Sequence, residues 1–386
     1  MKPKILIATD GLFPRIDGIA VFLDNIIPKI SDEFDITLIG PNSGPVNFDY
    51  DVKLIRFKTL KIRLGDNYYP SWVNLKILSK EIKKADVVFV QCFGTIGLWT
   101  TILAKMQKKP IMIYNHMLEW KVYADAQKHK LLKVPIHLSA HFLAKILYNM
   151  CKVILVASVE QAEIFNFMAR KVQKKVIHLG IDEKKFKPAA SKAVAKHDIG
   201  IEPTKFVVGY GGRVSYEKDL KTLYRAFLRF EKKHKNVVLL IAGGGHPDLE
   251  KLFSNKENVI ITGLKENLAP YYQAMDIYVL PSLIETTSLT TMEAMASGTP
   301  VIVTPVGFLK EYINDGQNGL VFPKKNSYTL YNKIVYLKEN SVIRERLARN
   351  GRDTILKNYT WELTAKEIIN SINELVPLKN RRDLSK

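Results

Sequence analysis

Short apolar runs alternate with amphipathic segments along the first half of the chain. A short apolar run predicts a buried strand, and apolar residues spaced three or four apart predict a helix. The predicted strands are residues 5–8, 36–39, 52–57, 87–90, 111–114 and 153–157. The predicted helices are residues 21–30, 72–84 and 98–106. This alternation favours a parallel sheet covered by helices.

The same pattern resumes after a polar stretch at residues 189–204, which we interpret as a linker and entry to a second domain. The predicted strands beyond it are residues 206–209, 237–242, 259–263, 277–280 and 301–304. The predicted helices are residues 220–233, 268–275 and 288–297. With 386 residues, the chain is long for one doubly wound domain and comfortable for two. The predicted fold class is therefore α/β with two domains.

The amino-acid composition is ordinary for a globular protein except in its net charge. Hydrophobic content of 47% and charged content of 25% are ordinary for a globular protein, whereas the net charge of +20 is high. Cys92 and Cys151 lie in apolar segments without metal-ligand spacing, so we expect reduced thiols in a cytoplasmic protein.

The apolar run at residues 5–9 ends at Asp10, which favours a first core strand over a signal peptide. Polar residues and glycines break the uncharged segment 87–104 into a strand and a helix, so we expect no membrane span.

Two glutamates flank the start of the predicted helix at residues 288–297. Glu285 and Glu293 have seven residues between them, Ser288 is the expected N-cap, and Gly298 ends the helix. Helical rise would separate the two carboxylates by about 12 Å, too far for the pair of about 5 Å in a retaining glycosidase. A ligand with an anion at the helix N-terminus and hydroxyls on either side fits instead, and a nucleotide sugar has this layout.

A second candidate is the loop that follows the strand at 206–209. Arg213 and Lys218 lie on it beside glycines, and two cations can neutralise two phosphates and stabilise a leaving diphosphate. The alternative is a surface ion pair with Glu217 or Asp219. The glycines at residues 243–245 lack a following Gly-Lys-Ser/Thr, which indicates a tight turn rather than a phosphate loop.

The segment from Glu285 to Glu293 and on to residue 303 resembles the signature of the retaining family-four glycosyltransferases (glycosyl transferases group 1) of GT-B fold. Residues 315–322 and 359–362 are also similar to that family. The resemblance implies two Rossmann-like domains around a cleft. The acceptor would bind in residues 1–185 and the donor in residues 186–360. A final helix at residues 361–377 would return to the first domain.

The resemblance also implies the site residues. The implied catalytic residues are His116, Arg213, Lys218 and Glu285. The implied donor-binding residues are Gly18, Arg213, Lys218, Thr262, Gly263, Glu285, Thr287, Ser288, Leu289, Thr290 and Glu293. In these roles Arg213 and Lys218 bind the diphosphate, Glu293 binds ribose hydroxyls, and Glu285 binds the transferred sugar. Taken alone, His116 is also compatible with a structural role after a strand. No metal or cofactor is implied.

Two basic stretches have no assigned role in this scheme. Residues 53–63 carry five basic side chains and no acid, and residues 121–152 carry six against Asp125. They are either a solvated basic surface or a surface that docks on an anionic membrane. Nucleic-acid binding would also use basic charge, but no nucleic-acid-binding motif accompanies it. Trp120 and Tyr123, near the second stretch, follow His116.

The predicted function is retaining transfer of a hexose from a nucleotide-diphosphate sugar, UDP- or GDP-linked, to a glycan or lipid acceptor. The reaction would take place in the cytoplasm or at the inner face of the membrane. Two alternatives use the same fold: a sugar-nucleotide epimerase or hydrolase, and a catalytically silent nucleotide-sugar-binding protein. The second is favoured by the loop after Glu285, where Thr286 to Leu289 replace the Gly-Phe-Gly-Leu common in the family.

Overall fold

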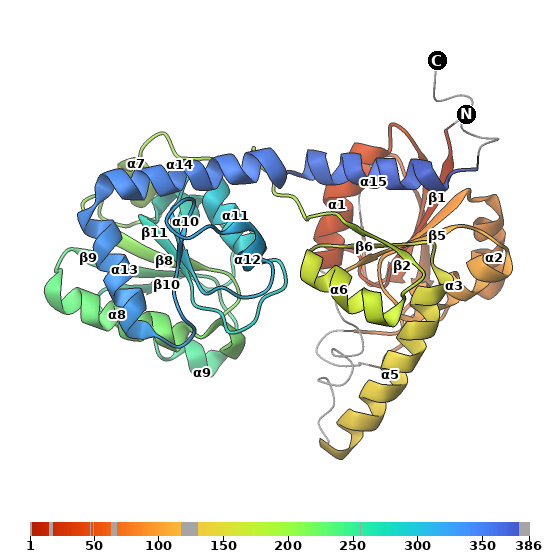
Figure 1. Ribbon diagram of the computed structural model, residues 1–386, viewed down its shortest axis with the longest axis horizontal. Coiled ribbons are helices and arrows are strands. Elements are labelled where there is room, and N and C mark those ends of the chain that lie inside the picture. Colours follow the sequence, from red (N-terminus) through yellow and green to blue (C-terminus); the bar gives the residue numbers. More distant parts are fainter. Residues whose placement is uncertain are drawn as a thin grey trace. The chain divides into compact units, whose positions relative to one another are not determined.

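The computed structural model describes residues 2–14, 18–46, 48, 50–62, 68–116, 130–254 and 256–377. The chain divides into two compact units, each with its own sheet (Figure 1). The first consists of Met1–His178 together with Trp361–Lys386, and the second is Leu179–Thr360. The division after His178 comes earlier than the predicted boundary after residue 185. The acceptor and donor roles of the two parts stay predictions.

The first unit contains a seven-stranded parallel sheet in the order β3-β2-β1-β4-β5-β6-β7. Its strands are β1 (Lys4–Ala8), β2 (Asp35–Asn42), β3 (Lys53–Lys58), β4 (Val87–Val90), β5 (Ile111–Asn115), β6 (Val153–Val156) and β7 (Gln173–Val176). Its helices are α1 (Gly18–Ile30), α2 (Leu75–Lys84), α3 (Thr95–Met106), α5 (Lys130–Met150), α6 (Val159–Met168) and α15 (Trp361–Leu375). Every residue of β4, in the middle of the sheet, is fully buried, which explains its uninterrupted apolar sequence.

The sequence did not predict β7. This edge strand contains two lysines and exposes Gln173 and Val176, so no apolar run marks it. Three helix starts of this unit were also misplaced, each by three residues. α1 begins at Gly18, before the predicted residue 21. α2 begins at Leu75, after the predicted residue 72, because the Asn74 side chain accepts hydrogen bonds from the N–H groups of Lys76 and Ile77. α3 begins at Thr95, before the predicted residue 98.

The early start of α3 has a physical cause. The buried Asp10 carboxylate, just past β1, accepts N–H groups of Ile96 (2.9 Å) and Gly97 (3.0 Å) in the first turn of the helix. A carboxylate from a distant segment thus replaces the local N-cap side chain. Burial nevertheless raises the Asp10 pKa, against the opposing effect of these hydrogen bonds.

The second unit contains a six-stranded parallel sheet in the order β10-β9-β8-β11-β12-β13. Its strands are β8 (Phe206–Gly211), β9 (Val237–Ala242), β10 (Val259–Ile261), β11 (Ile277–Leu280), β12 (Val301–Val303) and β13 (Leu320–Val321). Its helices are α7 (Lys192–Asp198), α8 (Leu220–Lys233), α9 (Pro247–Glu250), α10 (Ala269–Ala274), α11 (Leu289–Ala296), α12 (Leu309–Tyr312), α13 (Ser327–Glu339) and α14 (Ser341–Asn358). The predicted fold class, α/β with two Rossmann-like units, is confirmed.

The polar segment at residues 189–204 is not a free linker. It contains α7, whose buried Lys196 forms an ion pair of 2.7 Å with Asp276. Lys192 donates a hydrogen bond to the backbone oxygen of Met275 (2.5 Å). Because of these lysines, the sequence suggested a solvent-exposed linker. In the structure both lysines bind residues just before β11.

The last helix, α15, completes the first unit. The Trp361 ring packs edge-on against Phe22 of α1 at a centroid distance of 6.1 Å, and Glu362 forms an ion pair with Lys29 of α1 (2.5 Å). Both cysteines are buried and not disulfide-bonded, as predicted. None of the helices in the described ranges is long and apolar enough to cross a membrane.

Candidate functional site

Four loops of the second unit leave one edge of its sheet. They follow β8, β9, β10 and β11, whose carboxyl ends share an edge because the strands are parallel. The N–H of Gly212 donates to the Ala242 carbonyl (2.9 Å), and the N–H of Gly243 donates to the Thr262 hydroxyl (3.2 Å). Hydrogen bonds therefore connect the ends of three strands, β8, β9 and β10.

The loop after β9 packs directly on the loop after β8. A Cβ at Gly243 would lie 1.9 Å from the Gly212 carbonyl oxygen, and the φ of Gly243 is +150°. Only glycine satisfies both conditions. Val214 donates its N–H to the Gly244 carbonyl (3.0 Å), which closes the contact. The glycine run is thus a tight turn that brings two loops together.

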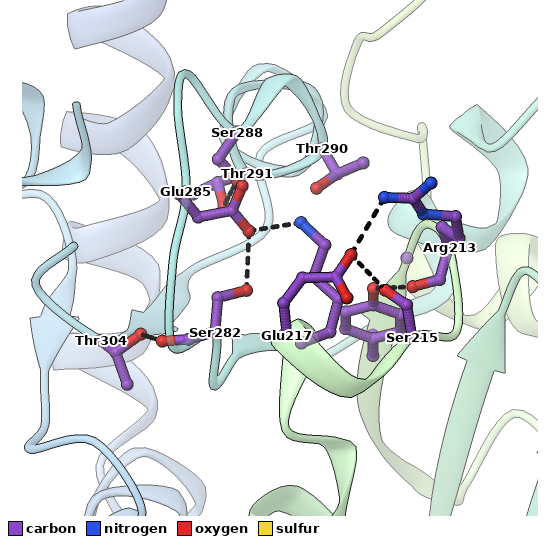
Figure 2. Close-up of polar contacts among 12 residues, drawn as sticks. Arg213, Ser215, Glu217, Ser282, Glu285, Ser288, Thr290, Thr291 and Thr304 are labelled. Carbon is purple, nitrogen blue, oxygen red and sulfur yellow. Dashed lines mark hydrogen bonds and ion pairs between the residues drawn. The ribbon is translucent and has the colours of Figure 1, made fainter. Parts of the chain in front are cut away.

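Arg213 lies on the loop after β8 and reaches the surface. Its guanidinium forms an ion pair of 2.9 Å with Glu217, and its side chain is 72% exposed (Figure 2). The Ser215 hydroxyl donates to the same Glu217 oxygen (2.6 Å). The surface ion pair considered as the alternative for Arg213 is therefore present, and its exposure makes it weak.

Lys218 instead reaches the loop after β11. Its ammonium lies 2.5 Å from the Glu285 Oε1 atom, and the two side chains are only 18% and 6% exposed. The Ser282 hydroxyl donates to the same oxygen (2.6 Å). Both recorded contacts of the Glu285 carboxylate with described residues use Oε1, so Oε2 keeps its capacity to accept hydrogen bonds.

The loop that carries Glu285 is held from both sides. The N–H of Leu283 donates to the Glu217 carbonyl (2.8 Å), and the N–H of Phe308 donates to the Thr286 carbonyl (3.0 Å). A Cβ at Gly307, whose φ is +52°, would lie 2.1 Å from the Glu285 carbonyl oxygen. The Glu285 backbone therefore lies directly on Gly307, and the loop has little freedom to move.

The start of α11 lies over the loop after β8. A Cβ at Gly212 would come within 3.3 Å of the Thr290 methyl carbon, and the Tyr278 hydroxyl donates to the Thr290 hydroxyl (3.0 Å). The predicted N-cap role of the Ser288 side chain is wrong. Ser288 has a left-handed backbone with φ of 58°, and its hydroxyl bonds the Thr291 hydroxyl (2.9 Å) instead of a backbone amide. Thr287 and Ser288 are buried, and Leu289 begins the helix.

Glu293 lies within α11, whereas Glu285 lies in the loop before it. The estimate of about 12 Å from helical rise therefore does not apply to this pair, because α11 begins only at Leu289. The buried Tyr272 donates its hydroxyl proton to the Glu293 carboxylate (3.0 Å). Burial raises the pKa of Glu293 to about 7, although the Tyr272 hydrogen bond opposes this rise.

Thr262 and Gly263 follow β10 at the same edge. The Thr262 hydroxyl donates to the Gly263 carbonyl (2.9 Å), and a Cβ at Gly263 would have no atom within 4 Å. The neighbouring Leu264 side chain is exposed. This backbone is accessible, as a nucleobase contact would require, and that contact stays a prediction.

Gly18 and His116 belong to the first unit. Gly18 is the exposed first residue of α1, and Asp17 before it lies outside the described residues. His116 follows β5, its Nε2 atom lies 3.0 Å from the Gln91 Oε1 atom, and burial lowers its pKa to about 3. Trp120 and Tyr123 also lie outside the described residues.

Some residues of this arrangement were not candidates in the sequence. Ser282 and Tyr272 bind the two glutamates, and Gln91 binds His116. Ser282 and Gln91 come just after buried strands, which is the signal that could have identified them. Tyr272 looked like an ordinary core residue. In the described ranges no three His, Cys, Asp or Glu side chains gather closely enough to hold a metal ion.

The sequence family "Glycosyl transferases group 1" matches residues 191–354, and "Glycosyltransferase Family 4" matches residues 16–185. An uncharacterised glycosyltransferase of Methanocaldococcus jannaschii is 31% identical over 58% of this chain and 60% of its own length. The alpha-monoglucosyldiacylglycerol synthase of Acholeplasma laidlawii is 25% identical over 99% of this chain and 100% of its own. The structure of Anabaena HepE in complex with UDP has a TM-score of 0.76 at 16% identity, over 97% of this chain and 100% of that one.

Proposed function

Because the chain belongs to the family-four, group 1 glycosyltransferases of GT-B fold, we propose that it moves a hexose from a nucleotide-diphosphate sugar to a lipid or glycan acceptor. In this proposal the anomeric configuration is retained, no metal ion takes part, and the reaction occurs in the cytoplasm. The observation that carries the proposal is the convergence of Arg213, Lys218, Glu285 and the start of α11 at one sheet edge.

The two cations suit a diphosphate leaving group in different ways. Arg213 is exposed and held by one weak ion pair, so its guanidinium can exchange Glu217 for phosphate oxygens at little cost. Lys218 is fixed by the buried pair with Glu285 and provides a preorganised charge. Charge that develops on the departing phosphate is stabilised most by donors that are already in place.

The two glutamates suit the hydroxyl groups at either end of the donor. Glu285 uses Oε1 for Lys218 and Ser282, which leaves Oε2 for a hydroxyl of the transferred sugar. Glu293 would accept the ribose hydroxyls through its carboxylate. The Acholeplasma relative, which spans the whole chain, is named as a glucosyldiacylglycerol synthase, and this name favours a lipid acceptor.

The test is a reaction of the purified chain with labelled UDP-glucose or GDP-mannose, with and without diacylglycerol vesicles or a glycan panel. We expect product only when an acceptor is present, with the anomeric configuration of the donor sugar. Consumption of donor without acceptor would instead indicate an epimerase or hydrolase. Donor binding without any turnover would indicate a silent binding protein.

Nucleotide binding is expected to strengthen as pH rises. Glu293 has a pKa of about 7, so below that value it is protonated and accepts hydroxyl hydrogens poorly. If only the carboxylate binds ribose, affinity for UDP or GDP should rise about tenfold between about pH 6 and pH 8. Calorimetry on the wild type and Glu293→Gln checks this, because phosphate ionisation affects both proteins equally. Parallel pH dependence in the two would contradict the ribose role.

The helix α5 supports a membrane-docking proposal. It carries exposed apolar side chains four residues apart, which place them on one stripe. They are Val134, Leu138, Phe142 and Ile146. Lys145 lies beside the stripe, and the sequence has no acid between Asp125 and Glu160. In Figure 1 the N-terminal part of α5 extends away from the sheet of its unit. Apolar residues flanked by cations suit an anionic bilayer surface.

The basic stretch at residues 53–63 gives less support to membrane docking than α5 does. Lys53 forms an ion pair with the buried Glu81 (2.5 Å), and Arg56 donates to the Pro41 carbonyl (3.2 Å). Arg63 lies outside the described residues, as do residues 121–129 of the second stretch. The proposal therefore rests on α5.

The double change Leu138→Glu and Phe142→Glu is expected to lower sedimentation with anionic vesicles at least about tenfold, because two charges would replace inserted apolar groups. The matched control is Phe167→Glu on α6, whose ring is 90% exposed in the same unit. It should bind vesicles like the wild type. Equal binding of the wild type to neutral and anionic vesicles would reject the docking surface.

A further inference from the structure

Glu217 places a negative charge directly beside a candidate phosphate-binding cation. Its Oε1 atom lies 2.9 Å from the Arg213 guanidinium and also accepts the Ser215 hydroxyl proton at 2.6 Å (Figure 2). Its carbonyl oxygen accepts the N–H of Leu283 at 2.8 Å, which fixes the backbone. Two of these three contacts do not involve Arg213. The carboxylate therefore keeps its place when the guanidinium turns to another anion.

Glu217 is ionised at physiological pH. Partial burial acts to raise the pKa of its carboxyl group, but the opposing contributions are larger in sum. The Ser215 hydrogen bond, a backbone N–H and the charges of Arg213 and Lys218 lower the pKa below its ordinary value. A phosphate held by Arg213 would consequently lie next to a full negative charge.

The two ion pairs at this sheet edge have no net charge. They join Arg213 to Glu217 and Lys218 to Glu285. An anion that binds here is therefore attracted by two cations and repelled by two carboxylates. Each further negative charge on the anion increases the repulsion from a carboxylate that cannot move away. The Ser215 hydroxyl keeps Glu217 in that position.

The proposed transfer adds such a charge to the diphosphate. The bond between the anomeric carbon and the terminal phosphate oxygen breaks, and its electron pair stays on that oxygen. The acceptor hydroxyl oxygen bonds the carbon and loses its proton to water. A nucleotide-diphosphate sugar carries two negative charges, and the terminal phosphate of the product gains a third above a pKa of about 6. The product is thus more negative than the donor.

We propose that Glu217 promotes release of the nucleotide diphosphate, because its fixed carboxylate repels the product more strongly than the donor. The inference rests on the proposed function, since it needs a diphosphate held by Arg213. It goes further by assigning to a residue outside the candidate set the task of separating product from donor by charge. All the contacts that support it lie within the second unit.

Glu217→Gln removes the charge and keeps the size of the side chain and its capacity to accept from Ser215. We expect the affinity for UDP to rise at least about threefold relative to the affinity for UDP-glucose. Calorimetry with each ligand measures the two values, and GDP with GDP-mannose replaces them if the donor is guanine-linked. UDP should also inhibit transfer by the variant more strongly, by a similar factor. At about 1 M sodium chloride the difference should shrink, because salt screens exposed charges.

The matched control is Glu339→Gln, which removes the same charge from the same unit. Glu339 is the exposed last residue of α13. The ammonium of its neighbour Lys338 lies 5.1 Å from the centre of the Phe206 ring, at the first residue of β8. Glu339 therefore lies at the opposite edge of the sheet from the site. Its variant should bind both ligands like the wild type.

The outcomes distinguish the two proposals. An equal change in the affinities for UDP and UDP-glucose, no change in either, or a difference that salt leaves intact would overturn the role of Glu217 and leave the proposed function standing. A merely structural role of Glu217 would give the first of these results, together with a lower melting temperature. A wild-type protein that binds neither nucleotide nor nucleotide sugar would overturn the proposed function, and the role of Glu217 with it.

Discussion

Arg213→Ala is expected to lower the rate of sugar transfer about 100- to 1,000-fold, which corresponds to a loss of about 2.7 to 4 kcal/mol of transition-state stabilisation. The guanidinium is the exposed cation at the sheet edge, and phosphate would replace its weak contact with Glu217. Because the side chain is 72% exposed, its removal should leave the melting temperature unchanged. Initial rates and thermal melts of the purified variant measure the two effects.

The matched control for this variant is Arg349→Ala. Arg349 is an exposed arginine on α14 of the same unit and carries the same charge. Arg349→Ala also removes one positive charge, but away from the proposed site. It should keep the wild-type transfer rate if the effect of Arg213→Ala depends on where that charge lies. Equal rates for Arg213→Ala and the wild type would remove Arg213 from the site.

Lys218→Met is expected to impair both transfer and stability. Transfer should fall about 100-fold or more, because a preorganised charge at the leaving group is lost. The unfolding free energy of the second unit should fall by about 3 to 5 kcal/mol, because Glu285 keeps a buried carboxylate without its cation. Adding Glu285→Gln removes that charge, so the double variant should regain part of the stability and none of the activity. Denaturant unfolding and transfer rates check both expectations.

A second buried pair of the same unit provides the control. Lys196 and Asp276 are 2.7 Å apart and nearly buried, outside the proposed site. Lys196→Met should therefore destabilise the protein and leave kcat of the folded fraction unchanged. Recovery of transfer in the Lys218→Met, Glu285→Gln double variant would show that the pair is structural.

Much of the fold could be predicted because buried strands have uninterrupted apolar sequences. β4, β9 and β11 have the predicted bounds for this reason. The edge strand β7 was missed because half of it faces solvent. The polar sequence of α7 was interpreted as a linker, because Asp276, the partner of the buried Lys196, lies far along the chain.

The candidate site could be predicted only in part. Residues that follow neighbouring strands gather at one edge, so Arg213, Lys218 and Glu285 were expected to lie together. The pairing of Lys218 with Glu285 instead of its sequence neighbours depends on how two loops pack, which spacing does not reveal. The raised pKa of Glu293 depends on its burial beside Tyr272, which the sequence could not reveal either. The capping role of Ser288 failed because its backbone is left-handed.

The contact of α15 with α1 has a consequence for synthesis on the ribosome. The second unit is one continuous segment, Leu179–Thr360, so all of its contacts are available once that segment has emerged. The first unit has to wait longer, because Phe22 and Lys29 gain Trp361 and Glu362 as partners only when the last helix is made. The first unit, which the second unit interrupts in the sequence, is thus the later of the two to finish folding. Until then, the apolar face of α1 that binds Trp361 is open to chaperones or to self-association.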